Sequence, residues 1–283
     1  AYAKLYNSKE YKGYNPYKAY EYNVIAIKVF NDLGNEEKEK YNKKGYTIES
    51  LSIIRDNCYS LAFNDCINDN SIECFKNYIS FFTNALEWKI KAQRAIYDIA
   101  FNIAEKINTP DSYKKFINDF NSFKLIDNYF QSDDLLKSAW RNVYALEFAK
   151  SKELNSIRSY QEYIDKYPKS HLFNDAVSLR NMLAFSEAIR INTIDSYQYF
   201  INKYPEAVEK KEAIQKRDEL AFNDAKKMNN SDAFKKFILK YPNSSFLSEA
   251  IIKFDNLLFQ DVVKTNSIKD YWAAIKEHPN NKN

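Results

Sequence analysis

The sequence predicts an all-α protein made of successive antiparallel helix hairpins with a period of about 37 residues. Four of the six prolines, Pro168, Pro205, Pro242 and Pro279, are each separated by 37 residues. All three glycines lie within the first 45 residues, whereas all-β and α/β chains need glycine in turns throughout. Hydrophobic residues make up 45% of the chain and aromatic residues 16%, which is enough for a packed interior and argues against global disorder.

Two further residue series repeat with the same intervals. An Asn followed by Ser, Thr or Asn recurs with spacings of 38, 47, 37, 37 and 37 residues, and a Phe series has the same spacings. The two series are Asn70, Asn108, Asn155, Asn192, Asn229 and Asn266, and Phe63, Phe101, Phe148, Phe185, Phe222 and Phe259. Two independent series that share one period and one irregular interval indicate an internal structural repeat.

The first half of each repeat reads as a short helix. Ser71, Thr109, Ser156, Thr193 and Ser267 stand where an N-cap hydroxyl is expected. Pro110 directly follows Thr109, at the first helical position, where proline is tolerated. The apolar residues of 233–241 recur at three- and four-residue steps, which predicts one buried stripe. The Tyr-Pro pair then ends the helix, because the residue before proline is pushed out of the α region.

The second half of each repeat reads as a longer helix. In 246–264 the predicted buried stripe comprises Ala250, Ile251, Phe254, Leu257, Leu258 and Val262. One hairpin cannot bury such a stripe alone, whereas stacking five or six hairpins buries a continuous core.

Residues 1–57 do not keep this register and are predicted to form an N-terminal helical cap or degenerate repeats. Here 17–30 reads as a helix that Gly34 ends, 35–45 as a polar connection, and 47–66 as a long helix. Residues 58–283 then form five to six hairpins. The 47-residue interval predicts an insertion of about ten residues near 121–140, which belongs on one face of the array.

The three cysteines leave their pairing open. Cys58 and Cys66, if they share one helix, lie about 12 Å apart along its axis, too far for a disulfide. Cys66 and Cys74 could meet across a helix–turn–helix, but the interpretation that we favour is buried small hydrophobic residues. The two histidines, His171 and His278, are far apart, and no CxxC pair occurs. We therefore expect no zinc site and no other cofactor.

Charge and hydropathy restrict the class of partner. The net charge of +4 is spread over segments of mixed sign without a run of five like charges, which disfavours a dedicated nucleic-acid binder. No stretch approaches 18 apolar residues, so no transmembrane helix is expected. The chain begins at Ala1 rather than Met, which is compatible with a trimmed product and with membrane association through a removed N-terminus or through partners.

The paired helices and the pattern around the prolines resemble tetratricopeptide-like repeats. The matching residues are Tyr167-Pro168-Lys169-Ser170 with Ala176, and Tyr241-Pro242-Asn243-Ser244 with Ala250. The chain is most similar, over roughly 60–283, to the variety found in bacterial cell-envelope proteins. The resemblance implies a right-handed superhelical array that binds other proteins, with the periplasm or cell envelope as the compartment and the cytoplasm as the alternative. The period of 37 departs from the usual 34, and no binding residue is carried over.

No motif indicates catalysis, because the sequence lacks a Gly-rich phosphate loop, HExxH, a nucleophile elbow and a His beside an acidic partner. The expected function is a non-catalytic protein–protein interaction scaffold within a larger complex. The alternative is a single-stranded nucleic-acid binder, since Tyr and Lys alternate in 11–18 and could stack bases and hold phosphates. Candidate partner-binding residues are Tyr11, Tyr14, Tyr17 and Trp272, whereas Trp88 and Trp140 are expected to pack.

Overall fold

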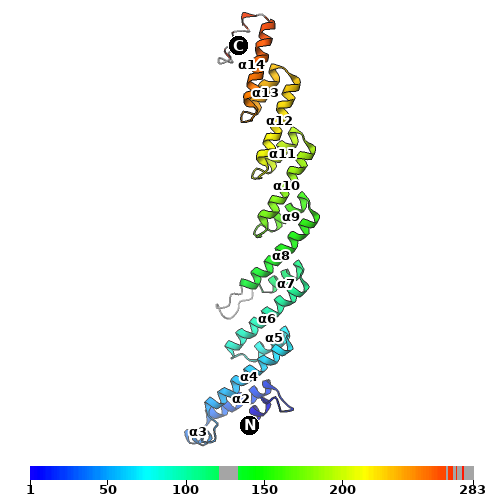
Figure 1. Cartoon of the computed structure of the whole chain (residues 1–283). Helices are drawn as coiled ribbons and strands as arrows, with labels where there is room; N and C mark the ends of the chain where they lie inside the picture. Colours follow the sequence, from blue (N-terminus) through cyan, green and yellow to red (C-terminus); the bar gives the residue numbers. More distant parts are fainter. Residues whose placement is uncertain (121–132, 266, 270–271, 273–275, 277–283) are drawn as a thin grey trace. The chain divides into compact units, whose positions relative to one another are not determined.

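The structure, a computed structural model, describes residues 1–120, 133–265, 267–269, 272 and 276. Its described residues form fourteen α-helices, packed as sequential antiparallel hairpins (Figure 1). The chain divides into two compact units, Ala1–Leu146 and Glu147–Asn283. The boundary predicted at residue 57 stays a prediction. Most of the predicted insertion, 121–132, and Pro279 lie outside the described residues.

Unit 1 contains the helices α1 to α7 and the first part of α8. Their bounds are α1 Tyr2–Tyr6, α2 Pro16–Asp32, α3 Asn35–Asn42, α4 Ile48–Asp69, α5 Ile72–Phe81, α6 Leu86–Ile107, α7 Pro110–Phe120 and α8 Asp133–Leu154. Helix α2 packs against α1 and α4, and the short α5 pairs with the long α6. Aromatic rings fill the core, with Phe75, Tyr78 and Phe82 fully buried between α4, α5 and α6.

Unit 2 contains the end of α8 and three short–long hairpins. Their helices are α9 Ile157–Lys166, α10 Phe173–Ile191, α11 Ile194–Lys203, α12 Lys210–Met228, α13 Ser231–Lys240 and α14 Leu247–Thr265. Each short helix pairs with the long helix that follows it, and α11 and α13 also pack against the long helix that precedes them. The predicted stripes are buried at most positions, including Phe234, Phe237 and Ala250. Ile251 of the predicted stripe, however, is exposed, and so is Phe259 of the repeating Phe series.

The segment 35–45 is not the polar connection that the sequence suggested, because α3 spans Asn35–Asn42. Helix α3 contains no buried residue. Its sequence therefore lacks the periodic apolar residues by which a helix is predicted. Its charges stabilise it instead. Glu36 and Glu37 occupy the first turn and Lys40 the last, which complements the helix dipole.

The repeating Asn residues end the long helices. Asn70, Asn108, Asn155, Asn192 and Asn229 are the described non-glycine residues with positive φ, between 40° and 52°. Asn adopts this left-handed conformation more readily than other residues with a Cβ, and it satisfies helix-end carbonyl groups through its N–H. In Asn192 this N–H donates to Ala188 O at 2.9 Å, and the side-chain oxygen accepts from the Tyr197 hydroxyl at 3.1 Å. The Asn series therefore fixes where each long helix stops.

Replacing Asn192 by Val is expected to lower the free energy of unfolding by about 1–2 kcal/mol, because a β-branched residue is strained at positive φ. Asn192→Gly removes the strain and costs only the Tyr197 hydrogen bond, about 1 kcal/mol. Asn229 supplies the matched control, since Phe234 stands five residues later where Asn192 has Tyr197. Asn229→Gly should thus cost less than Asn192→Gly in urea unfolding. Equal costs would show that the hydroxyl contributes nothing.

The N-caps and the Tyr-Pro turns have the predicted geometry. Ser71, Ser156 and Thr193 each accept a hydrogen bond from the backbone N–H three residues later, and Thr109 does the same for Ser112. Tyr167, Tyr204 and Tyr241 precede the prolines, are buried, and leave the α region with φ between −127° and −129°. The proline is therefore a helix stop, as predicted.

A pair of small residues joins each long helix to the next short one. The residues four before and four after the repeating Asn face each other, and the Ser112 and Ser196 hydroxyls donate across this joint to Ala104 O and Ala188 O at 2.9 and 3.0 Å. The same positions in the first repeat are Cys66 and Cys74, which form a disulfide with Cα atoms 5.3 Å apart. The favoured interpretation of these two as unpaired hydrophobic residues was wrong. Cys58 is buried outside any disulfide, as expected.

Two arginines connect neighbouring hairpins in unit 2. Arg180 donates to the Gln161 side-chain oxygen at 2.7 Å, and its guanidinium lies 4.9 Å from the centroid of the Tyr204 ring in the next hairpin. Arg217 makes the same contacts one repeat later, to Gln198 and Tyr241, at 2.8 and 4.9 Å. Each arginine, on a long helix, thus contacts the preceding short helix and the turn of the next hairpin. These polar and cation–π contacts, together with apolar packing, fix the orientation of consecutive hairpins.

Candidate functional site

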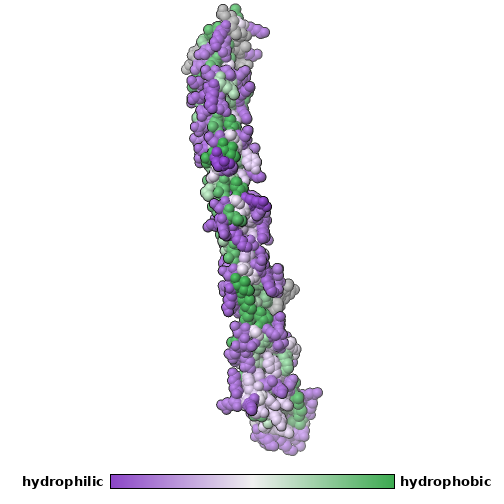
Figure 2. All heavy atoms as spheres, turned by 90° about the vertical axis from the view of Figure 1, so that its right-hand side faces the viewer, coloured by the Kyte–Doolittle hydropathy of each residue, from purple (hydrophilic) through white to green (hydrophobic). Residues whose placement is uncertain are grey.

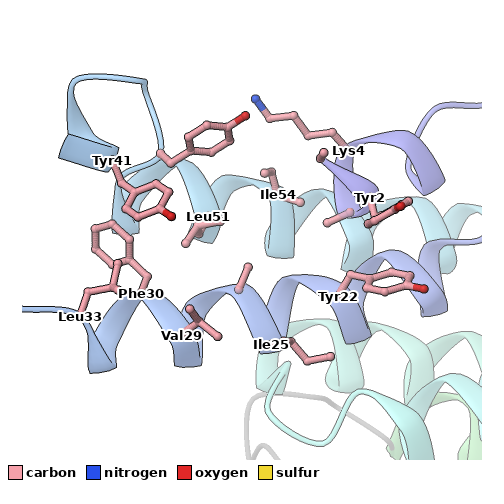
Figure 3. A pocket seen from close by; sticks show the side chains of 14 residues that line it. Tyr2, Lys4, Tyr22, Ile25, Val29, Phe30, Leu33, Tyr41, Leu51 and Ile54 are labelled. Atoms are coloured by element: carbon pink, nitrogen blue, oxygen red, sulfur yellow. The ribbon is translucent and has the colours of Figure 1, made fainter. Parts of the chain in front are cut away.

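A pocket of about 330 Å³ opens in unit 1 between α1, α2, the α3 region and α4 (Figure 3). One wall is the outer face of α2, where Tyr22, Ile25 and Val29 follow one another at steps of three and four residues, and Leu33 continues this wall just past the helix end. Such a row lies along one side of a helix. Ile25 is 58% exposed and Val29 54%. The middle of this α2 row, at Ile25 and Val29, is thus an apolar surface that the other described elements leave largely open.

The floor of the pocket belongs to the hydrophobic core. Leu51 and Ile54 from α4 line it, and both are buried members of the cluster that also contains Ala19 and Cys58. Phe30 of α2 also lines the pocket and packs against this cluster. The pocket is therefore a gap in the layer of side chains above an otherwise closed core, and an apolar group placed there would extend that core.

Stacked tyrosines stiffen the rim at the α1 end. The Tyr22 ring lies 5.4 Å from Tyr2 and 5.6 Å from Tyr6, and the Tyr6 pair is nearly parallel at 13°. The Lys18 ammonium lies 5.9 Å from the centroid of the Tyr6 ring. Offset aromatic pairs add about 0.5–1.5 kcal/mol beyond area burial. This rim is thus held by contacts within the unit.

Lys4 is the one residue with a charged side chain among those that line the pocket. Figure 3 shows its side chain reaching over the opening, while the Tyr41 hydroxyl points into the space above Leu51. Among the described residues Lys4 forms no ion pair. The pocket therefore combines an apolar body with a cation and a phenol hydroxyl, both of which can donate hydrogen bonds.

None of the sequence-predicted candidates Tyr11, Tyr14 and Tyr17 lines this pocket. All three are half-buried. Tyr11 contacts the Tyr6 ring edge to face at 5.5 Å, and Tyr17 packs against Phe81 and Phe82 at 4.9 and 5.1 Å. Their part in partner binding stays a prediction, but most of their ring surface serves packing.

Tyr14 is held by a polar contact. Its hydroxyl donates to Asp65 Oδ2 at 2.9 Å. Burial, and then the hydrogen bond to Asp65, raise the pKa of Tyr14, because both disfavour the phenolate. The burial of Tyr17 likewise raises the pKa of its own hydroxyl. Neither phenol is therefore set up as an acid or base near neutral pH.

The three tryptophans differ in exposure. Trp272 is 68% exposed, and its role in binding stays a prediction. Trp88 packs on the unit 1 core, and Trp140 stacks on Tyr144 at 5.5 Å. The contact of Trp88 agrees with the packing role expected for it, whereas Trp140 is 38% exposed, so its packing role stays a prediction.

Other reactive groups offer little chemistry. Burial raises the pKa of the Cys58 thiol to about 11, which keeps it protonated and unreactive near neutral pH. Within the described ranges, no three His, Cys, Asp or Glu side chains come together in a way that could hold a metal ion. None of the helices in those ranges is long and apolar enough to cross a membrane.

A second surface feature repeats within unit 2. The residue immediately before each left-handed Asn of this unit is apolar and exposed: Leu154 by 69%, Ile191 by 49% and Met228 by 66%. We call these three residues the turn row. In unit 1, by contrast, Asp69 precedes Asn70. The turns from long to short helices lie toward the right of unit 2 in Figure 1, and Figure 2 views that side, where hydrophobic patches alternate with hydrophilic residues. Ile107 holds the same position in unit 1.

Sequence reasoning missed both features, although each left a signal. An apolar residue precedes every Asn of the repeat series from 108 to 229, and the turn row supplies the last three of the pairs Ile-Asn, Leu-Asn, Ile-Asn and Met-Asn. In the sequence of α2, apolar residues occupy both sides of the helix, the α2 row on one side and the core-facing residues on the other. A surface helix that packs on one side only requires a single apolar side.

The fold defines this chain as an all-helical protein of paired antiparallel helices in a repeating pattern. Neither models of protein families nor curated proteins match it.

Proposed function

We propose that this protein is a non-catalytic protein–protein interaction scaffold of the tetratricopeptide-like type. The observation that carries the proposal is the turn row, in which Leu154, Ile191 and Met228 expose apolar side chains at one repeat position in three successive long helices. Single exposed apolar residues are common on protein surfaces, whereas a regular series at one position offers a partner repeated anchoring points. Helical repeat arrays bind elongated partners in this way.

The charges beside the turn row favour a partner that also carries acidic groups. Lys152, Arg190 and Lys226 lie within the last turn of the same long helices. Cations at helix C-termini also complement the helix dipole, so part of their role is structural. Arg190 already pairs with Glu187 at 2.6 Å, so the preference for a segment with apolar and acidic residues rests on Lys152 and Lys226.

The cysteines and the resemblance to cell-envelope repeat proteins support the compartment that we propose. The disulfide between Cys66 and Cys74 is compatible with an oxidising compartment, and such bonds are rare in a reducing cytosol. This supports a place in a bacterial periplasmic or cell-envelope assembly, with the protein as one subunit or domain.

The test uses a variant with all three turn-row residues replaced by Gln, which favours helix and removes the apolar surface. Its matched control replaces Tyr199, Leu239 and Ile252 by Gln, since these unit 2 residues are equally exposed, at 60–73%. Purified protein is used to capture partners from native envelope and soluble fractions, which are identified by mass spectrometry. We expect the wild type and the control to recover the same proteins and the turn-row variant to lose them.

Two results would contradict the proposal. Undiminished recovery by the turn-row variant would show that this surface is not the binding surface. Recovery of nucleic acid alone, with an affinity that falls steeply with salt, would favour the single-stranded nucleic-acid binder that the sequence left as the alternative.

A further inference from the structure

The α1–α4 pocket has the features of a small-molecule site, which is a function beyond the scaffold and independent of it. Its volume of about 330 Å³ lies at the lower end of the range for ligand pockets. Leu51, Ile54 and Phe30 of the core line it, together with the exposed Ile25 and Val29. A ligand with an apolar body would remove this surface from water, at a gain of about 25 cal/mol per Å².

The charge of the ligand follows from the rim. Lys4 is the one charged side chain that lines the pocket, no acidic side chain lines it, and Lys4 forms no ion pair among the described residues. An anionic group at the opening would gain a charge-assisted hydrogen bond, whereas a cationic group would meet repulsion. The Tyr41 hydroxyl points toward Leu51 inside the pocket, away from the Lys4 ammonium (Figure 3), so the anionic group is assigned to Lys4 alone.

A carboxylate suits the Lys4 ammonium, because it is negatively charged and its two oxygens only accept hydrogen bonds. We propose that the α1–α4 pocket binds a small amphipathic carboxylic acid of the fatty-acid type. Its alkyl chain lies along the α2 row over Leu51 and Ile54, and its carboxylate meets Lys4 at the rim. The stacked tyrosines Tyr2, Tyr22 and Tyr6 hold the α1 side of the pocket in place before the ligand arrives, which lowers the ordering cost of binding.

The test is a calorimetric titration of the full chain with dodecanoate below its micelle concentration, with dodecanol and dodecylammonium as neutral and cationic probes. We expect saturable binding of dodecanoate and none of dodecylammonium. Lys4→Met should weaken dodecanoate about tenfold and leave dodecanol unchanged, because one charge-assisted bond of modest strength is lost.

Two valines of α2 provide a matched pair for the apolar part. Val29 lines the pocket, whereas Val24 is also exposed but lies off it. Val29→Gln should weaken both dodecanoate and dodecanol about fivefold, since part of an apolar side-chain contact is lost. Val24→Gln should change neither. Circular dichroism of every variant checks that the helices remain.

Several outcomes would overturn the proposal. These are no saturable binding of dodecanoate, equal binding of dodecylammonium, or dodecanoate binding that Lys4→Met leaves unchanged. A dimer in sedimentation that Val29→Gln dissociates and that dodecanoate does not displace would assign the pocket to a second copy of the chain instead. An apolar peptide that binds at Val29 while dodecanoate does not would likewise replace the proposed ligand.

Discussion

Replacing Phe200 by Ala is expected to lower the free energy of unfolding by about 3–5 kcal/mol, the usual cost of removing a buried aromatic side chain. Phe200 is 1% exposed, and its ring lies 5.2 Å from Phe185 of α10 and 5.4 Å from Tyr204 at the next turn. It therefore joins α10 to α11 and to the Tyr-Pro stop at the end of α11. Urea unfolding followed by circular dichroism measures the effect.

The neighbouring residue supplies the control. Tyr199 precedes Phe200 on the same helix and is 62% exposed. Tyr199→Ala should change the free energy of unfolding by less than about 1 kcal/mol, as for most surface substitutions. Similar losses in the two variants would contradict the assignment of Phe200 to the core of unit 2.

Reduction of the Cys66–Cys74 disulfide is expected to lower the stability of unit 1 by about 2–3 kcal/mol. The bond closes a short loop with a sequence separation of 8, and a short loop restricts the unfolded chain by this amount in the chain-entropy model. The variant Cys66→Ala/Cys74→Ser copies the Ala104–Ser112 pair of the next repeat, whose hydroxyl donates across the joint at 2.9 Å. It should recover about 1 kcal/mol relative to Cys66→Ala/Cys74→Ala.

A reductant separates the disulfide from other effects. Wild-type protein should unfold at lower urea concentration when dithiothreitol is present, whereas the Ala/Ser variant should not respond. Cys58 remains a thiol in both proteins, so it cannot account for a difference. Identical wild-type curves with and without reductant would show that the bond contributes nothing to stability.

Local rules explain why much of the repeat could be predicted. The N-cap residues, the Tyr-Pro stops and the apolar stripes each act within one helix, so that a single residue and its near neighbours decide the outcome. The helix α3 escaped because charged residues stabilise it without a buried face. The glutamates in its first turn and the lysine in its last turn are visible in the sequence. They do not distinguish a polar helix from a polar loop, because helices are recognised in a sequence by the period of their apolar residues.

The candidate site was much less predictable. Tyr11, Tyr14 and Tyr17 were selected for being aromatic beside lysines, yet Tyr14 reaches Asp65 and Tyr17 reaches Phe82, contacts between segments far apart in the chain. The α1–α4 pocket exists because the neighbouring elements leave part of the outer face of α2 open. The arrangement of those neighbours cannot be read from the sequence of α2 itself. The repeated apolar residues of the turn row are visible in the sequence. Only the exposure of Leu154, Ile191 and Met228 in the structure shows that they lie on the surface and are not packed in the core.

The sequence by itself determined the class of fold, the period, and the points at which most helices begin and end, because caps, prolines and left-handed Asn residues act locally. Only the tertiary structure decided that Cys66 meets Cys74, that Arg180 reaches from Gln161 to Tyr204, and that Lys4 stands over an open apolar pocket. Each of these depends on distances between residues of different helices, which are set when hairpins pack together and are not contained in the pattern of any one helix.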